Sequence, residues 1–286
     1  MKLTLSDPNT GGDLLLIHDE PVIKRHVFTR DGEKKYFTIA WNRGDKQSIS
    51  IDGDEHEFMP GTILPLMFDQ TFSIENANDI VAWQFNREFY CIIDHDAEVS
   101  CVGFLFGAGD MISIEIDDTI RAKFDSLLHL FTAELQTKDT IQKEMLIALL
   151  KRLIIDITKL ARSAYVPDPK LQGEKLDIFR QFNLLVEANF HNEHSVNFYA
   201  EQLNKSPKTL SNLFPQLSQK TPVQIIQNRI MTEARRLLAY TDKTVKQITY
   251  ELGFEDPAYF SNFFKRHTSL SPADFRKNRQ IPAEGK

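Results

Sequence analysis

The chain has 286 residues, which at roughly 150 residues per domain is enough for about two folded domains. Its 42% hydrophobic and 26% charged residues are typical of a folded globular protein and exclude a disordered, collagen-like or purely coiled-coil chain. The longest apolar stretch, residues 145–155, is interrupted by Lys151 and Arg152 and falls short of the roughly 20 residues that a membrane crossing needs, so we expect no membrane partner. The start of the chain lacks the pattern of a secretion signal, and the only cysteines are Cys91 and Cys101. We therefore expect a cytoplasmic protein without a disulfide scaffold.

The charge is distributed unevenly along the chain. The net charge is -6, but residues 1–170 contain 18 Lys and Arg against 28 Asp and Glu, whereas residues 171–286 contain 16 against 12. An acidic front and a basic back indicate two different tasks. Because phosphate groups attract a basic surface, we expect any anionic polymer to bind the C-terminal part.

The first part of the chain is expected to be mainly β. From residue 35 to about residue 116, short β-branched and aromatic runs alternate with turn-forming residues, which is typical of a sandwich or a small barrel. The alternation of apolar and polar residues in 48–51 and 111–116 predicts strands with one face toward solvent. We therefore assign residues 1–118 to a β domain.

Helices are expected after this domain. Residues 121–164 contain neither Gly nor Pro, and five apolar residues recur there at alternating steps of four and three, the spacing of a helix seam. The seam either joins two copies of the chain or packs on the chain's own β domain, and the sequence favours neither. Prolines end this segment, so we assign residues 119–166 to a helical dimerisation segment and residues 167–174 to a linker. The seam consists of Leu146, Leu150, Leu153, Ile157 and Leu160.

Four short motifs place helix starts in residues 175–286. In each motif a residue that can cap a helix precedes a proline, which the first helical turn tolerates because its nitrogen needs no hydrogen there. They predict helices over 207–217, 222–240, 257–267 and 272–279. The motifs are Ser206-Pro207, Thr221-Pro222, Asp256-Pro257 and Ser271-Pro272.

The C-terminal part also contains an internal repeat. A short amphipathic helix, a turn and a capped second helix occupy residues 196–214 and recur about 50 positions later in residues 245–264. The apolar residues of each second helix recur at i, i+3 and i+4, and its opposite face is small and polar. This pattern is typical of a helix-turn-helix unit, whose second helix enters the major groove of DNA. The candidate DNA-binding residues are Lys208, Thr209, Ser211 and Asn212 in the first unit and Ala258, Ser261, Asn262 and Lys265 in the second.

The same residues carry a resemblance to a known family. The motif runs Val245-x-x-Ile248, Gly253-Phe254-x-Asp256-x-x-Tyr259-Phe260-Ser261-x-x-Phe264-Lys265 and Ser271-Pro272-x-x-Phe275-Arg276. With it, the sequence resembles the AraC/XylS family of bacterial transcription regulators. The resemblance implies a C-terminal all-α domain over residues 175–286, with two helix-turn-helix units joined by a long helix. For the front of the chain it implies a cupin-like sensory barrel followed by dimerising helices.

The sequence departs from the family pattern at four positions. Pro215 stands where a basic residue is usual, Gln219 and Ser269 where glycine is usual, and Thr249 where alanine is usual. Because proline removes a helical N–H, we expect Pro215 to kink the first recognition helix and to weaken that unit's hold on DNA.

The linking helix over residues 222–240 would be about 28 Å long, close to the ~34 Å turn of B-DNA. Two recognition helices separated in this way would enter successive major-groove segments on one face of a duplex. Asn212 and Asn262 occupy corresponding positions, and each amide either pairs with an adenine or is an ordinary solvated residue. Four cations are expected to bind phosphates unless they only aid solubility, namely Lys208, Lys265, Arg266 and Arg276.

The sequence gives little support to catalysis. A metal-dependent cupin enzyme would carry a His-x-His pair, whereas His56 stands between two glutamates and no such pair occurs. Asp94-His95-Asp96 is more readily explained as a turn than as a metal site. Since a glycine-rich phosphate loop and a Gly-x-Ser-x-Gly turn are also missing, we expect no catalytic residues, no metal and no cofactor.

The sequence therefore predicts a mixed, two-domain protein, mainly β at the N-terminus and all-α at the C-terminus. We expect a sequence-specific transcription regulator, not an enzyme, whose N-terminal domain senses a small molecule or a partner. The expected partners are double-stranded DNA and a second copy of the chain, and a small-molecule effector and RNA polymerase are further candidates. The alternative is a cupin-type enzyme with a degenerate DNA-binding tail.

Overall fold

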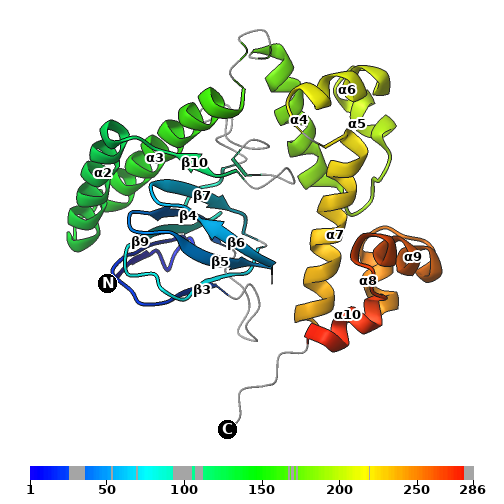
Figure 1. Cartoon of the computed structure of the whole chain (residues 1–286), viewed down its shortest axis with the longest axis horizontal. Helices are drawn as coiled ribbons and strands as arrows, with labels where there is room; N and C mark the ends of the chain where they lie inside the picture. The colour runs from blue at the N-terminus through cyan, green and yellow to red at the C-terminus, as the bar shows by residue number, and fades with distance from the viewer. Residues whose placement is uncertain are drawn as a thin grey trace. The chain divides into compact units, whose positions relative to one another are not determined.

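The computed structural model describes residues 1–25, 36–52, 54–68, 70–92, 105–106, 112–166, 168, 171, 173–218 and 220–279. The chain divides into two compact units, Met1–Glu174 and Lys175–Lys286 (Figure 1). None of the described helices combines the length and the apolar character that a bilayer crossing requires.

The first unit contains a six-stranded antiparallel sheet. At its centre β4 (Tyr36–Asn42) pairs with β9 (Ile80–Asn86) over their whole length, from Tyr36 opposite Asn86 to Asn42 opposite Ile80. The order is β1-β2-β9-β4-β7-β10. The remaining strands are β1 (Lys2–Ser6), β2 (Asp13–Ile17), β7 (Thr62–Leu66) and β10 (Ile114–Glu115).

A second sheet has four strands in the order β3-β8-β5-β6. The predicted strand over residues 48–51 is confirmed within β5, because Ile49 and Ile51 are buried while Ser48 is exposed and Ser50 is half-buried. Of the strand predicted over 111–116, Ile114–Glu115 is formed, and Met111 lies outside the described residues. The strands are β3 (Ile23–Arg25), β8 (Phe72–Ile74), β5 (Gln47–Ile51) and β6 (Asp54–Phe58).

One hydrophobic core joins the two sheets. Ala40 and Ala82 contribute to it from the larger sheet, and Ile49, Phe58 and Ile74 contribute from the smaller one. The described strands form two open sheets rather than a closed ladder. The mainly-β character of this region is thus confirmed, and these strands form a sandwich instead of a closed barrel.

Two helices cover the other face of the larger sheet (Figure 1). The first is α2 (Asp118–Gln136) and the second is α3 (Gln142–Tyr165). Trp41 of β4 lies 5.9 Å from Phe124 of α2, and Trp83 of β9 lies 5.9 Å from Phe131, measured between ring centroids. Ala40 and Ala82 point the other way, into the core between the sheets. Consecutive residues of β4 and β9 therefore pack alternately against the helices and against the smaller sheet.

The predicted helix seam belongs to this layer. Leu146, Leu150, Leu153 and Ile157 are 0% exposed in the single chain, and Leu160 is half-buried. Side chains that their own unit already covers have no area left to bury against a second copy. This burial contradicts the interpretation of the seam as a contact between two copies and favours packing within the chain.

The second unit is all-α, as predicted. Helices begin at Pro207, Pro222, Pro257 and Pro272, which confirms the four predicted starts. The helix predicted over 207–217 is shorter, because regular α-helix ends at Leu213. The helices are α4 (Glu174–Asn189), α5 (Val196–Gln202), α6 (Pro207–Leu213), α7 (Pro222–Tyr240), α8 (Val245–Glu251), α9 (Pro257–Thr268) and α10 (Pro272–Arg279), and a 3₁₀ turn, η2 (Phe214–Gln216), follows α6.

Candidate nucleic-acid interface

The second unit contains two helix-turn-helix arrangements, α5–α6 and α8–α9. Their first helices are capped in the same way, because the hydroxyls of Ser195 and Thr244 accept hydrogen bonds from backbone N–H groups of α5 and α8. Their turns also correspond, since Asn204 and Gly253 both adopt a left-handed conformation, with φ of +51° and +74°. The sequence repeat is thus a repeat of local structure.

Gly253 cannot be replaced without strain. Besides its positive φ, a Cβ atom at this position would lie 2.2 Å from the carbonyl oxygen of His191. Asn204, in the corresponding turn, carries one of the side chains that tolerate the left-handed region best. The second turn therefore requires glycine for two independent reasons.

Aromatic contacts hold the inner face of α6 and α9, the second helices of the two arrangements. Phe214, just after α6, lies 4.7 Å from Phe182 of α4 between ring centroids. In the second arrangement Phe254 lies 5.3 Å from both Phe260 and Phe263 of α9. The predicted apolar faces are confirmed by the burial of Leu210, Leu213, Phe214, Phe260, Phe263 and Phe264.

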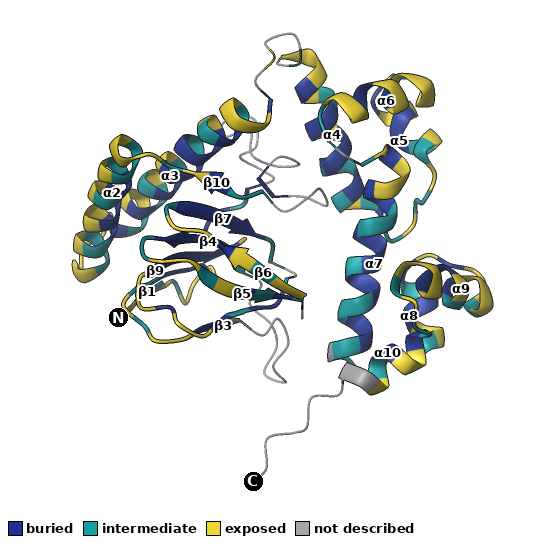
Figure 2. Cartoon of the chain, viewed as in Figure 1, coloured by how far each residue is buried: buried dark blue, intermediate teal, exposed yellow. Residues whose placement is uncertain are grey.

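The opposite faces of α6 and α9 are open to solvent (Figure 2). Every predicted DNA-binding residue lies on these faces, and Ser261 alone among them is half-buried, because its hydroxyl donates to the carbonyl oxygen of Pro257 at 2.8 Å. The exposed residues are Lys208, Thr209, Ser211 and Asn212 on α6 and Ala258, Asn262 and Lys265 on α9.

The two recognition helices differ at their N-termini. In α6 the cap is Ser206, and its hydroxyl lies 2.8 Å from the hydroxyl of Thr209. In α9 the cap is Asp256, whose carboxylate accepts from the N–H groups of Ala258 and Tyr259 at 2.9 and 3.2 Å. The Thr209 side chain therefore takes part in the cap of α6. At the corresponding position of α9, the side chain of Tyr259 takes no part in capping.

The departures from the family pattern have local structural effects. A 3₁₀ turn begins directly after Leu213, because Pro215 has no N–H to continue the α-helical hydrogen bonding. Thr249 is buried, and its hydroxyl donates to the carbonyl oxygen of Val245 at 2.8 Å. Ser269 ends α9 with a φ of +62°, a conformation that suits glycine. Gln219 lies outside the described residues.

Arg276 has a structural role. Its Nε donates to the carbonyl oxygen of Leu238 at 3.0 Å, and its guanidinium also donates to the carbonyl oxygen of Lys243 at 2.7 Å. The first bond ties α10 to the C-terminal end of α7, and the second ties it to the segment between α7 and α8. Arg266, by contrast, is exposed in the last turn of α9.

A buried ionic network joins α4 to α7. The Nε of Arg229 donates to both carboxylate oxygens of Glu187, at 3.0 and 2.9 Å, and its guanidinium lies 3.9 Å from the centroid of the Phe190 ring. Glu233 pairs with Arg229 and with Arg236. Burial alone would raise the pKa of Glu233, but the hydrogen bond from Arg236 and the charges of both arginines outweigh it and hold this pKa below its ordinary value. The network fixes the linking helix α7 to α4.

Tyr259 is a surface residue that is not among the predicted DNA-binding residues. It lies in the first turn of α9, three residues before Asn262, and its side chain is 59% exposed. The spacing of three places both residues on one helix face, which is the pattern that would have identified it.

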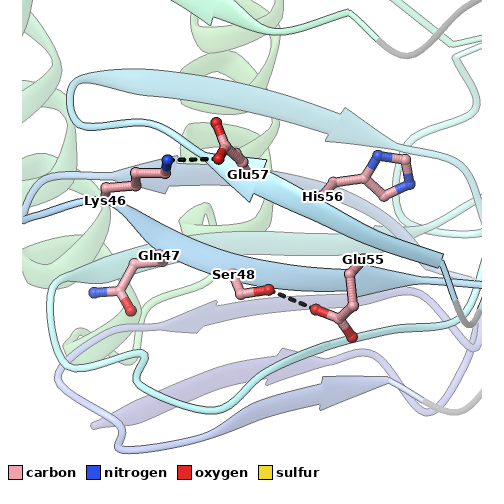
Figure 3. A pocket seen from close by; sticks show the side chains of 6 residues that line it. All are labelled: Lys46, Gln47, Ser48, Glu55, His56 and Glu57. Carbon is pink, nitrogen blue, oxygen red and sulfur yellow. Dashed lines mark hydrogen bonds and ion pairs between the residues drawn. The ribbon is translucent and has the colours of Figure 1, made fainter.

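The first unit has a polar depression of about 360 Å³ on the β5–β6 hairpin (Figure 3). Lys46 lies 2.5 Å from Glu57, and the Ser48 hydroxyl donates to Glu55 at 2.5 Å, so both glutamates are paired within the hairpin. Among the described residues, no three His, Cys, Asp or Glu side chains are arranged to hold a metal ion. Asp94-His95-Asp96 lies outside that part of the chain. The depression is lined by Lys46, Gln47, Ser48, Glu55, His56 and Glu57.

Similarity to known proteins concentrates in the second unit. A sequence profile described as a helix-turn-helix domain matches residues 199–278, from α5 to α10. The HTH-type transcriptional activator RhaS of Escherichia coli O139:H28 (strain E24377A / ETEC) is 33% identical over 102 residues, which are 35% of this chain and 37% of RhaS. RhaS of Salmonella schwarzengrund (strain CVM19633) is 34% identical over 94 residues, or 33% of this chain and 34% of that protein. The chain thus matches little more than a third of the length of these relatives.

Two solved structures are also similar. ToxT from Vibrio cholerae, in its P21 crystal form, has 12% sequence identity and a TM-score of 0.45, covering 98% of this chain and 100% of that one. The C-terminal domain of AraT, a response regulator from Geobacillus stearothermophilus, has 25% identity and a TM-score of 0.37, covering 40% of this chain and 95% of that one. The sequence matches to the helix-turn-helix profile and to RhaS identify residues 199–278 as a helix-turn-helix domain of the type found in AraC/XylS transcription regulators.

Proposed function

We propose that the protein is a sequence-specific DNA-binding regulator of transcription whose two helix-turn-helix units bind successive major-groove segments. The observation that supports this most strongly is the pair of equivalent recognition helices, each with a buried aromatic face and an exposed, small and polar face. The linking helix α7 has 19 residues, which makes it about 28 Å long, against ~34 Å for one turn of B-DNA. The matched relatives are named as transcriptional activators, which favours a regulator over the enzyme alternative.

Each predicted DNA-binding residue of the recognition helices has a role in this proposal. Asn212 and Asn262 would each pair with an adenine edge through their amides. Lys208 and Lys265 would bind phosphates and hold the helices in register on the duplex. The remaining positions are short, so that the helix backbone can approach the base edges; these are Thr209, Ser211, Ala258 and Ser261.

We propose that the second helix-turn-helix unit contributes at least as much specificity as the first. Helix α9 is a continuous α-helix of 12 residues, whereas α6 has 7 residues and passes directly into a 3₁₀ turn. A longer regular helix presents residues one and two turns beyond the cap at a constant orientation, which bidentate base contacts need.

We propose that the first unit is the sensory domain that the family resemblance implies. Residues 1–170 contain ten more acidic than basic residues, 28 against 18, so this unit is poorly suited to DNA. Its effector would be a small molecule or a partner protein, and RNA polymerase remains a further candidate partner. Because the main partner is DNA, we propose a cytoplasmic location.

We also propose that the chain forms a homodimer, through the outer face of the α2–α3 hairpin instead of the buried seam. Three large apolar side chains on this hairpin are exposed, namely Leu130 at 54%, Ile141 at 58% and Met145 at 47%. Apolar patches on a protein surface mark contact sites, and a second copy of the chain would cover these three side chains.

Selection of duplexes from a randomised library by the full-length protein tests the proposed function. We expect enrichment of one sequence with two conserved tracts about one helical turn apart, and hydroxyl-radical footprinting should show two protected tracts on one face of that duplex. Failure to enrich any sequence, with binding to all duplexes alike, would contradict sequence-specific regulation.

A further inference from the structure

The exposed ring of Tyr259 stands out among the residues of α9. Its 59% exposure equals or exceeds that of every other large hydrophobic side chain in the described part of the chain. It is the third residue of the helix, and the N-terminal residues of a recognition helix are the ones that reach base edges. A ring in this position is solvated in the free protein and available to DNA.

The surroundings of Tyr259 hold it in place without covering it. Its ring centroid lies 5.9 Å from that of Phe254, at an interplanar angle of 44°. Phe254 is itself buried against Phe260 and Phe263, so it provides a rigid support on one side of the ring. The Tyr259 backbone N–H is bound by the Asp256 carboxylate, and its hydroxyl makes no hydrogen bond to any residue that the structure describes.

The corresponding residue of the first recognition helix offers a different chemistry. Thr209 occupies the equivalent position on α6, and its hydroxyl is engaged with the cap residue Ser206. A large apolar surface is therefore presented at this position by the second unit, whereas the first unit offers only the methyl group of Thr209. The two units would read different bases here even where their asparagines read the same one.

The chemistry of the major groove identifies a target for this ring. Thymine alone places an apolar group, its C5 methyl, on the major-groove edge, and apolar side chains recognise it by direct contact. Asn262 lies one turn further along the same face and suits an adenine. An aromatic ring beside such an amide matches a site rich in A·T pairs.

We propose that Tyr259 is a specificity-determining residue whose ring contacts the methyl group of a thymine next to the base pair bound by Asn262. This inference rests on the proposed function, because it assigns a base contact within the recognition helix. The hydroxyl is not required for the contact, since the methyl group interacts with the ring.

Replacement of thymine by deoxyuridine in the selected duplex tests this inference, because the exchange removes only the C5 methyl group. Full-length wild-type protein should lose about fourfold in affinity at one thymine of the second tract, the value expected for one buried methyl group. Tyr259→Ala should bind the thymine and deoxyuridine duplexes equally, and Tyr259→Phe should retain the fourfold difference. Tyr250→Ala is the matched control, since Tyr250 is 53% exposed but lies on α8 outside the recognition helix, and it should behave as wild type.

Two results would overturn the inference while leaving the proposed function intact. One is a wild-type protein that is insensitive to deoxyuridine at every thymine of its selected sequence. The other is a Tyr259→Ala variant that keeps the wild-type ratio of affinities. If no sequence is enriched in the selection, the proposed function itself fails, and the assignment of Tyr259 fails with it.

Discussion

Asn212 and Asn262 occupy equivalent positions, but we expect them to contribute unequally to DNA binding. Both are exposed on the outward face of a recognition helix. Asn262 lies in the middle of the regular helix α9, whereas Asn212 lies two residues before the 3₁₀ turn that follows α6, and its own carbonyl oxygen accepts a hydrogen bond from the Gln216 side chain at 2.7 Å. The difference between the two units therefore arises in the backbone and not in the amides.

Asn262→Ala should weaken binding to the selected duplex by about 1–3 kcal/mol, the value of one bidentate base contact, and leave binding to a scrambled duplex nearly unchanged. Fluorescence anisotropy with the two duplexes measures both. The matched control is Lys265→Ala, which should weaken binding to both duplexes alike and lower the salt slope by about one unit, because it removes a phosphate contact. If Asn212→Ala loses discrimination while Asn262→Ala keeps it, the ranking of the two units is reversed.

Sequence patterns identify surface residues better than they identify residues with distant partners. The polar faces of α6 and α9 follow from helical spacing, and the structure places them on the outside. The structural role of Arg276 could not be predicted from the sequence, because the groups that accept its hydrogen bonds are backbone carbonyls 38 and 33 residues earlier in the chain. Tyr259 is not among the predicted DNA-binding residues because aromatic residues are usually buried, although its spacing of three from Asn262 places it on the exposed face of α9.

At the scale of elements, cap residues carried most of the predictive information. Each of the four cap-proline pairs marks a helix start in the structure, because a capping side chain and a proline both act within one turn of the chain. The strands β1 to β3 were not predicted, since each has only three to five residues and they lie before the regular succession of turns. The periodicity of α3 predicts that its apolar face is covered. It does not show whether a second copy or the chain itself covers that face.

Gly253→Ala should destabilise the second unit by about 2–4 kcal/mol, because alanine there combines a left-handed backbone with a collision against the carbonyl oxygen of His191. Thermal unfolding followed by far-UV circular dichroism measures the loss. The matched control is Asn204→Gly, which places glycine in the equivalent turn and should change stability by less than about 1 kcal/mol. Equal effects of the two substitutions would show that the turn of the second unit has no special constraint.

Glu233→Gln should destabilise the second unit at neutral pH by about 3 kcal/mol, because it removes one partner from a buried group of charges. The pH dependence has a defined sign. The pKa of Glu233 is lowered in the folded state, so the unfolded chain takes up the proton at a higher pH than the folded chain does. The stabilisation is therefore complete above the ordinary value of 4.5 and is lost as the pH falls below it.

Urea unfolding of both proteins between pH 3 and pH 7 checks this prediction. The difference in stability between wild type and Glu233→Gln should shrink as the pH falls below 4.5. Glu255→Gln, at an exposed position of the same unit, is the control and should leave the curve unchanged. A difference that stays constant over the whole range would show that the charge of Glu233 does not stabilise the unit.

At the scale of the whole molecule, the charge asymmetry of the sequence coincides with a division into two units. The acidic residues concentrate before residue 170, and the division falls between Glu174 and Lys175. The division and the mainly-β or all-α character of each part follow from composition and from the change in hydrophobic period. Whether the β strands close into a barrel could not be predicted from the sequence, because barrels and sandwiches have the same alternation of apolar and polar residues along each strand.

The mode of self-association also belongs to this scale. Met145→Glu should give a folded monomer if the outer face of the α2–α3 hairpin joins two copies, whereas Leu150→Glu should unfold the first unit because Leu150 is fully buried. Light scattering reports the mass, and tryptophan fluorescence reports the folding of the first unit, since Trp41 and Trp83 both lie there. A Met145→Glu variant that remains dimeric would place the contact elsewhere.

The central claim is that the second unit by itself distinguishes one DNA sequence from another. Its most direct test is the affinity of residues 175–286, which form a compact unit of their own, for the selected duplex and for a scrambled duplex of equal composition, measured over a range of salt concentrations. We expect a preference on the order of 10³-fold for the selected duplex, and affinities for both duplexes that fall linearly with salt on logarithmic axes. Equal affinity for the two duplexes at every salt concentration would contradict the claim.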